Sequence, residues 1–219
     1  MESSLFKDLQ TKLQLVSVYE NIPKREATPV QGWTTAYYEN SLREYLQQQP
    51  TNKSCLIVEV GTWLGASAIQ AANIVRDLNR NDVILCIDTW LGSPEHFLSM
   101  PKQNGFPQIY GEFLQNVVNH GHQDRILPLP LPSLQAIQVL RSLYPKGADV
   151  IYVDAAHEYL PVYLDIVHYW DYLKVGGRYL GDDYTENWPG VKQAVNQFAT
   201  ERSLHLDVIN DWVWKIDKV

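Results

Sequence analysis

The sequence has few cysteines, a deficit of basic residues and no long apolar run. The two cysteines, Cys55 and Cys86, each lie within an apolar run, which favours buried reduced thiols over a disulfide. The formal net charge is −7, since 25 acidic residues outnumber 18 basic ones, and this argues against binding to a phosphate backbone. No apolar run approaches the roughly 20 residues of a membrane span, and the first residues lack a signal-peptide core. We therefore expect a cytoplasmic protein without nucleic-acid or membrane partners.

What the sequence does contain is the composition of a globular protein, with 45% hydrophobic and 20% charged residues over a length of 219. We expect one α/β domain over residues 53–219, preceded by a helical extension or cap over residues 1–52. Apolar residues at helical spacing predict one helix over 5–16 and a second over 37–46. The aromatic residues of the extension either pack it onto the domain or line a pocket; they are Trp33, Tyr37 and Tyr38.

From residue 56 the sequence alternates between strands and helices. The predicted strands cover 56–60, 83–87, 126–129, 149–153, 178–181, 204–209 and 212–216. The predicted helices cover 66–78, 109–119, 134–143 with Ser133 as N-cap, 161–173 with Gly176-Gly177 as stop signal, and 190–201. This alternation predicts a parallel sheet with helices on both faces. Asn210-Asp211 predicts a hairpin, so the last strand should run antiparallel.

The stretch Cys55–Ser67 combines a buried strand, an acidic residue near its end and a glycine turn that opens a helix. Asp88 ends the next strand, about 20 residues further on, where an acidic residue accepts hydrogen bonds from ribose hydroxyls. Trp63 stands where a dinucleotide-binding turn has its middle glycine. This disfavours a pyrophosphate ligand and a nucleotide-dependent oxidoreductase, and favours a nucleoside cofactor.

Three carboxylates follow two later strands. Asp154 ends one strand and Asp182-Asp183 end the next, so neighbouring strands would bring them together. Carboxylates this close raise one another's pKa unless a cation neutralises them. An all-oxygen site suits Mg²⁺ or another hard divalent ion rather than zinc. The alternative is that Asp154 caps the following helix and the other two are solvated, with no metal.

Together these motifs resemble class I S-adenosylmethionine-dependent methyltransferases, including the branch of macrocin-type O-methyltransferases and cephalosporin-hydroxylase-like proteins. The resemblance runs from about residue 53 to the C-terminus. It implies a Rossmann-like seven-stranded mixed sheet in the order 3-2-1-4-5-7-6, with the last strand antiparallel. The segments that carry it are Glu59–Ser67, Asp88, Asp154–His157, Gly176–Asp183 and Pro189–Val195.

The resemblance also implies a cofactor site. Gly61 and Gly65 would border the methionine and ribose portions of S-adenosylmethionine, and Asp88 would hold the ribose diol. Ser133 would lie near the adenine, with Trp90 stacked on it or packed within its loop. The implied cofactor-binding residues are Glu59, Gly61, Gly65, Ser67, Asp88, Trp90, Ser133 and Asp154.

The expected reaction is O-methylation of a small-molecule hydroxyl, on a diol, sugar or phenol. Mg²⁺ on Asp154, Asp182 and Asp183 would bind two substrate hydroxyls and lower the pKa of one. His157 would then take the proton as general base, unless it has a structural role. The alternatives are a metal-independent methyltransferase with His157 or Asp154 as base, and a non-catalytic nucleoside-binding protein. Besides the methyl acceptor, the expected partner is a second copy of the chain, which the aromatic extension could contact.

Overall fold

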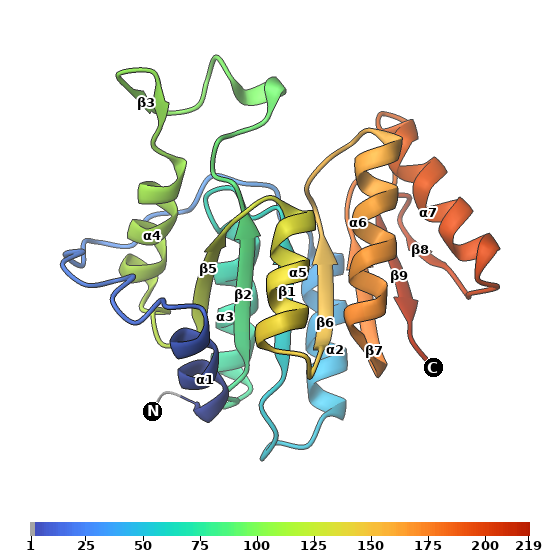
Figure 1. The fold of residues 1–219 in the computed structure, drawn as a ribbon, viewed down its shortest axis with the longest axis horizontal. Coiled ribbons are helices and arrows are strands. Elements are labelled where there is room, and N and C mark those ends of the chain that lie inside the picture. The colour runs from blue at the N-terminus through green and yellow to red at the C-terminus, as the bar shows by residue number, and fades with distance from the viewer. Residues whose placement is uncertain (1–2) are drawn as a thin grey trace.

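The computed structural model describes residues 3–219, so the first two residues of the predicted extension lie outside the described part. Seven strands form one sheet in the order β5-β2-β1-β6-β7-β9-β8 (Figure 1). The strands are β1 (Leu56–Val60), β2 (Val83–Asp88), β5 (Ile126–Pro130), β6 (Ala148–Val153), β7 (Leu173–Gly181), β8 (Asp207–Ile209) and β9 (Val213–Asp217). The first five of these pair in parallel and β9 pairs antiparallel to β7. The predicted strand order and the antiparallel last strand are confirmed.

Helices cover both faces of the sheet. One face carries α2 (Ala36–Gln48), α3 (Ala66–Asp77) and α4 (Ile109–His120), and the other carries α1 (Ser4–Lys12), α5 (Ser133–Leu143), α6 (Tyr159–Tyr172) and α7 (Pro189–Glu201). Figure 1 shows α5 and α6 in front of the strands with α2 and α3 behind them. The alternation of side chains along β1 explains this arrangement: Leu56, Val58 and Val60 face one core, and Ile57 faces the other.

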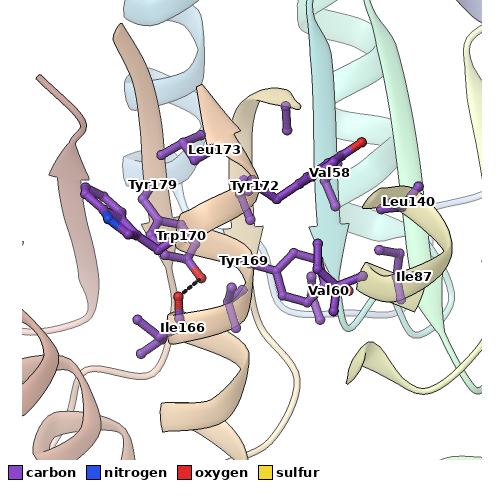
Figure 2. Packing of buried hydrophobic residues seen from close by; sticks show 14 of the residues in the cluster. Val58, Val60, Ile87, Leu140, Ile166, Tyr169, Trp170, Tyr172, Leu173 and Tyr179 are labelled. Carbon is purple, nitrogen blue, oxygen red and sulfur yellow. Dashed lines mark hydrogen bonds between the residues drawn. The ribbon is translucent and has the colours of Figure 1, made fainter. Parts of the chain in front are cut away.

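Buried aromatic side chains join α6 to the sheet and to α5. Figure 2 shows Tyr169, Trp170 and Tyr179 packed among the aliphatic residues of this core. The Tyr179 hydroxyl donates to the Ile166 carbonyl at 3.1 Å, and the Tyr169 hydroxyl donates to the Ser133 carbonyl at 2.9 Å. Each ring therefore contributes roughly 1.5–3 kcal/mol of burial without leaving its hydroxyl unpaired. The Tyr169 bond also holds the first turn of α5 against α6.

The N-terminal extension packs on both faces of the sheet. Phe6 and Leu9 of α1 are buried in one core, whereas Tyr38 of α2 stacks on Tyr152 of β6 in the other at 4.1 Å between ring centroids. The prediction that the first helix reaches residue 16 is wrong. That helix ends at Lys12, and Val16 is 61% exposed. The helical spacing of apolar residues in the sequence therefore continues past the residues of this helix that pack on the core. The boundary at residue 52 stays a prediction.

Two predicted helix signals have other roles. Ser133 is the first residue of α5, and Pro132 occupies the N-cap position. The glycine pair does not stop α6, which ends at Tyr172; Gly176-Gly177 lies inside β7. A Cβ on Gly177 would come 2.9 Å from the Asp149 carbonyl oxygen, so the glycine allows a close approach of two strands where their register shifts.

The segment after β2 rises above the carboxyl ends of the strands (Figure 1). It contains the short helix η1 (Pro94–His96) and a small antiparallel hairpin of β3 (Lys102–Gln103) and β4 (Phe106–Pro107). Over residues 3–219, no helix combines the length and apolar character needed to cross a membrane.

Candidate active site

A cleft of about 650 Å³ lies at the carboxyl ends of β1, β2, β5, β6 and β7. This is the position where open α/β sheets bind ligands. Most of the predicted site residues meet in this one cleft. Gly61, Ser67, Asp88, Ser133, Asp154, His157, Asp182 and Asp183 line it, whereas Glu59, Gly65 and Trp90 do not.

The glycine turn is held against the end of β6. Gly61 has φ +85°, and its N–H donates to the Ile87 carbonyl at 2.8 Å. A Cβ at this position would lie 1.9 Å from the Asp154 carbonyl oxygen, so only glycine fits. Gly65 differs, because it opens α3 with φ +90° and its missing side chain makes room for Phe113. It serves the start of the helix rather than the cleft surface.

Asp88 fixes the shape of this turn. Its Oδ2 accepts from the backbone N–H groups of Thr62 and Trp63, both at 2.9 Å, and its Oδ1 accepts from that of Trp90 at 2.8 Å. A carboxylate has about four acceptor positions, so Oδ1 retains capacity for a ligand hydroxyl. Asp88 therefore organises the turn and faces the cleft at once.

Glu59 supports the turn from beneath and does not contact the cleft. Its side chain is fully buried and its Oε1 accepts from the Ser67 hydroxyl at 2.7 Å. Burial raises the pKa of Glu59 to about 8, and the Ser67 hydrogen bond opposes this rise. Glu59 Oε2 and Thr62 Oγ1 are buried without a hydrogen-bond partner among the described residues. Of the two residues, only Thr62 lines the cleft, so this unmet polar capacity lies directly beneath the cleft surface.

The expected stacking of Trp90 on adenine does not agree with where its indole lies. Trp90 is only 2% exposed, and its Nε1–H donates to the Trp63 carbonyl at 2.8 Å. Its ring packs against Tyr110 and Phe113, with centroids 4.9 Å apart in each pair. The side chain belongs to the core beneath the loop, as in the packing alternative, because these contacts hold its ring inward.

The carboxylates after β6 and β7 interact with one another. Burial, followed by the charges of Asp182 and Asp183, holds the pKa of Asp154 well above its usual range. Burial likewise raises the pKa of Asp182 to about 6, although Tyr152 donates to its Oδ2 at 2.8 Å and Asp183 N–H to its Oδ1 at 2.9 Å. Within residues 3–219 no three Asp, Glu, His or Cys side chains are already arranged to hold a metal ion.

His157 is held between Asp183 and Trp188. Its Nε2 lies 3.0 Å from Asp183 Oδ2, and its ring stacks on the Trp188 indole with centroids 3.8 Å apart and planes 15° apart. Asp183 has φ +62°, a sparsely populated conformation that turns the chain just after β7. A Cβ on Gly190 would lie 2.5 Å from the His157 carbonyl oxygen, so the start of α7 packs directly on this backbone. Three segments thus fix the imidazole.

Sequence reasoning left part of the cleft wall without an assigned role. Trp33, His96 and Trp63 form an aromatic stack, in which the His96 ring lies 5.1 Å from Trp33 and 4.9 Å from Trp63. The three residues come from separate segments with no periodic signal, although Trp33 belonged to the cluster for which a pocket was one alternative. Glu158 and the buried Asp165 also line the cleft. A lone acidic residue in or before a helix carries no sequence signal that marks it as lining a cleft.

The sheet order, the glycine turn and the acidic residue at the end of β2 define a class I methyltransferase fold. Residues 58–184 match a family model described as a methyltransferase domain, and this match spans more than half of the chain. The chain therefore belongs to this family of methyltransferase domains, and the resemblance seen in the sequence is confirmed.

Comparisons with individual proteins give one relative in sequence and several methyltransferases of similar structure. An uncharacterized protein, R132, of Acanthamoeba polyphaga mimivirus is 29% identical over 148 residues, covering 66% of this chain and 59% of that protein. The O-methyltransferase of Bacillus cereus, in complex with SAH (S-adenosylhomocysteine), has a similar structure, with a TM-score of 0.60 and 16% identity over 97% of this chain and 91% of that chain. NovP, an O-methyltransferase, has a TM-score of 0.59 and 18% sequence identity, with 99% of both chains covered. The calicheamicin methyltransferase CalS11 has a TM-score of 0.60 and 16% sequence identity, with 99% of this chain and 94% of that chain covered. At these identities the structures establish the fold.

Proposed function

We propose that this protein is an S-adenosylmethionine-dependent O-methyltransferase that acts on a hydroxyl of a small molecule, such as a diol, sugar or phenol. The observation that carries the proposal is the cleft, in which the Gly61 turn, Asp88 and the His157–Asp183 pair meet. The named O-methyltransferases of the same fold support it, one of them in complex with SAH.

The residues along β1, β2 and β5 suit the methyl donor. Gly61 keeps the floor of the cleft open for the methionine portion, because any side chain there would collide with Asp154. Asp88 has acceptor capacity for the ribose hydroxyls, and Ser133 lies on the wall where the adenine would extend. The donor, when bound, supplies an electrophilic methyl group on a positively charged sulfur.

The residues after β6 and β7 suit the acceptor. As the acceptor oxygen forms its bond to the methyl carbon, the carbon–sulfur electron pair stays on sulfur and the hydroxyl proton passes to the imidazole of His157. Asp183, 3.0 Å from Nε2, stabilises the imidazolium that results. Trp188 keeps the ring plane fixed against rotation. The His157–Asp183 pair can accept the proton without a metal ion. It therefore favours metal-independent methyl transfer as the second candidate function.

We further propose that a divalent cation assists the reaction. Asp154, Asp182 and Asp183 would hold it, and its chemistry would be to bind two acceptor hydroxyls and lower the pKa of one. The support lies in the mutual electrostatics of the carboxylates, since burial and like charge both raise the pKa of Asp154. A cation would relieve this repulsion. Ligation would also require Asp183 to share its carboxylate between His157 and the metal.

Calorimetry with S-adenosylhomocysteine and with NAD tests the proposed function. We expect S-adenosylhomocysteine to bind and NAD not to bind, because Trp63 replaces the glycine that admits a pyrophosphate. NAD binding without S-adenosylhomocysteine binding would reject the proposal. A screen of diols, sugars and phenols with a methyl-labelled donor then distinguishes an enzyme from a non-catalytic nucleoside-binding protein, which would bind the donor and transfer nothing.

A further inference from the structure

The ionisable side chains that line the cleft are mostly acidic. Its wall contains no lysine or arginine among the residues that the structure describes there. Its two histidines are His96, which hydrogen-bonds to Ser93, and His157, which is paired with Asp183. Six carboxyl side chains line the same cleft, and they are Asp88, Asp154, Glu158, Asp165, Asp182 and Asp183. A methyl acceptor with a phosphate or carboxylate near the carboxylates after β6 and β7 would therefore meet repulsion and no lysine or arginine partner.

The acceptor half of this cleft also offers aromatic faces. Trp188 and Trp212 line it with the carboxylates, and Trp33, with 58% of its surface exposed, also lines the cleft. Tryptophan is the side chain whose ring face attracts a cation most strongly. Carboxylates and indole rings that line one cleft form an environment in which a positively charged group is favoured by both kinds of neighbour.

We propose that the methyl acceptor is a cationic small molecule, with an amine attached to the ring or sugar that carries the reacting hydroxyl. The inference rests on the proposed function and names the substrate class of that same cleft. The ammonium would lie near Glu158, apart from the carboxylates proposed to hold the divalent cation, and contact an indole face, while the neutral hydroxyl faces His157. The transfer itself is unchanged, because the amine takes no part in bond formation.

A matched ligand series tests the charge of the acceptor. Dopamine, 4-ethylcatechol and 3,4-dihydroxyphenylacetate share a catechol ring and have a cationic, neutral and anionic side chain of similar size. Dissociation constants are measured by calorimetry on the full chain saturated with S-adenosylhomocysteine, at low salt, first with EDTA and then with Mg²⁺. We expect dopamine to bind at least about fivefold tighter than 4-ethylcatechol and the acid to bind most weakly, with the difference shrinking as salt screens the charges. Equal affinities, a preference for the acid, or no dopamine binding would overturn the proposal.

Two charge-neutralising variants make the test specific to the cleft. Glu158 lies one residue before α6, lines the cleft and makes no capping bond through its side chain. We expect Glu158→Gln to weaken dopamine binding about threefold, as for one charge at several ångströms in a wet site, and to leave 4-ethylcatechol unaffected. Asp171→Asn is the control, since Asp171 lies at the far end of α6, half-exposed and paired with Arg141. Equal losses in both variants would contradict the proposal.

The same experiments separate this inference from the proposed function. If S-adenosylhomocysteine itself does not bind, the proposed function fails. If it binds and the catechol series shows no preference for the cation, only the cationic acceptor is rejected.

Discussion

The imidazole Nε2 of His157 lies 3.0 Å from Asp183 Oδ2, although the two residues are 26 positions apart in the chain. The contact joins the loop after β6 to the loop after β7, and the Trp188 ring covers one face of the imidazole. A base held by a carboxylate on one side and a ring on another loses little orientational freedom when a substrate arrives. The first prediction concerns this pair.

Removing either member of the pair should slow methyl transfer without weakening donor binding. We expect His157→Ala and Asp183→Asn each to lower the rate by about 10²-fold or more, the usual contribution of a positioned base. The dissociation constant of S-adenosylhomocysteine should change less than twofold. The control is His205→Ala, which breaks a similar ion pair, with Nε2 2.9 Å from Asp207 Oδ1, on a side chain that is 87% exposed. A wild-type rate in Asp183→Asn would contradict the assignment.

Metal removal should abolish the reaction if a cation assists it. We expect turnover to be lost in excess EDTA and restored by Mg²⁺. Mg²⁺ should also raise the melting temperature of the wild type and not that of Asp182→Asn, because a bound ion stabilises the folded state. The thermal readout needs no acceptor. Full activity in excess chelator would instead identify the metal-independent mechanism.

The Gly61 turn should not tolerate a side chain. Gly61→Ala would place a Cβ 1.9 Å from the Asp154 carbonyl oxygen, so we expect a loss of roughly 2–4 kcal/mol in the free energy of unfolding and loss of S-adenosylhomocysteine binding. Gly105→Ala is a matched control, because Gly105 has φ +84°, nearly the same as Gly61, with no atom near its missing Cβ. Its cost should be limited to backbone strain of about 1 kcal/mol. Urea unfolding and calorimetry measure both effects.

Glu59 should make the protein less stable as the pH rises. The pKa of Glu59 is about 8 in the folded protein, above the ordinary value of 4.5, so the folded state holds its proton longer than the unfolded state does. The associated stability is fully present below about pH 4.5 and is lost as the pH rises to about 8. Glu59→Gln keeps an acceptor for Ser67 and removes this titration. The difference in unfolding free energy between variant and wild type should therefore shift in favour of the variant across this range, by up to a few kcal/mol. A difference independent of pH would contradict the buried, protonated carboxyl.

The fold was predictable because most of its elements carry a local signal. The apolar runs of β1, β2 and β6 are bounded by polar or glycine residues, and the hairpin before β9 has a turn signal of its own. The errors arose where tertiary contacts decide. The glycine pair at Gly176-Gly177 resembles a helix stop in sequence, yet Gly177 is required by the approach of Asp149 from a neighbouring strand. Likewise, nothing local to Val16 reveals that the core ends before it.

The candidate site was predictable to the extent that strand ends converge. Asp88, Asp154 and Asp183 lie at or just after the ends of strands, so a parallel sheet brings them to one edge. Which way a loop side chain turns is not encoded in this way. Trp90 points into the core and Trp33 into the cleft because of backbone turns and distant partners. The spacing of residues in the sequence could not show which of these two tryptophans lines the cleft.

The contact between Gly61 and the Asp154 carbonyl has a consequence for engineering this protein. Since the turn assigned to the methyl donor rests directly on the strand end assigned to the acceptor, libraries that randomise either position should consist mostly of inactive clones. The segment after β2 and Trp33 also line the cleft, and neither takes part in the contact between Gly61 and Asp154. Directed evolution toward new acceptors should therefore yield most of its improved variants there.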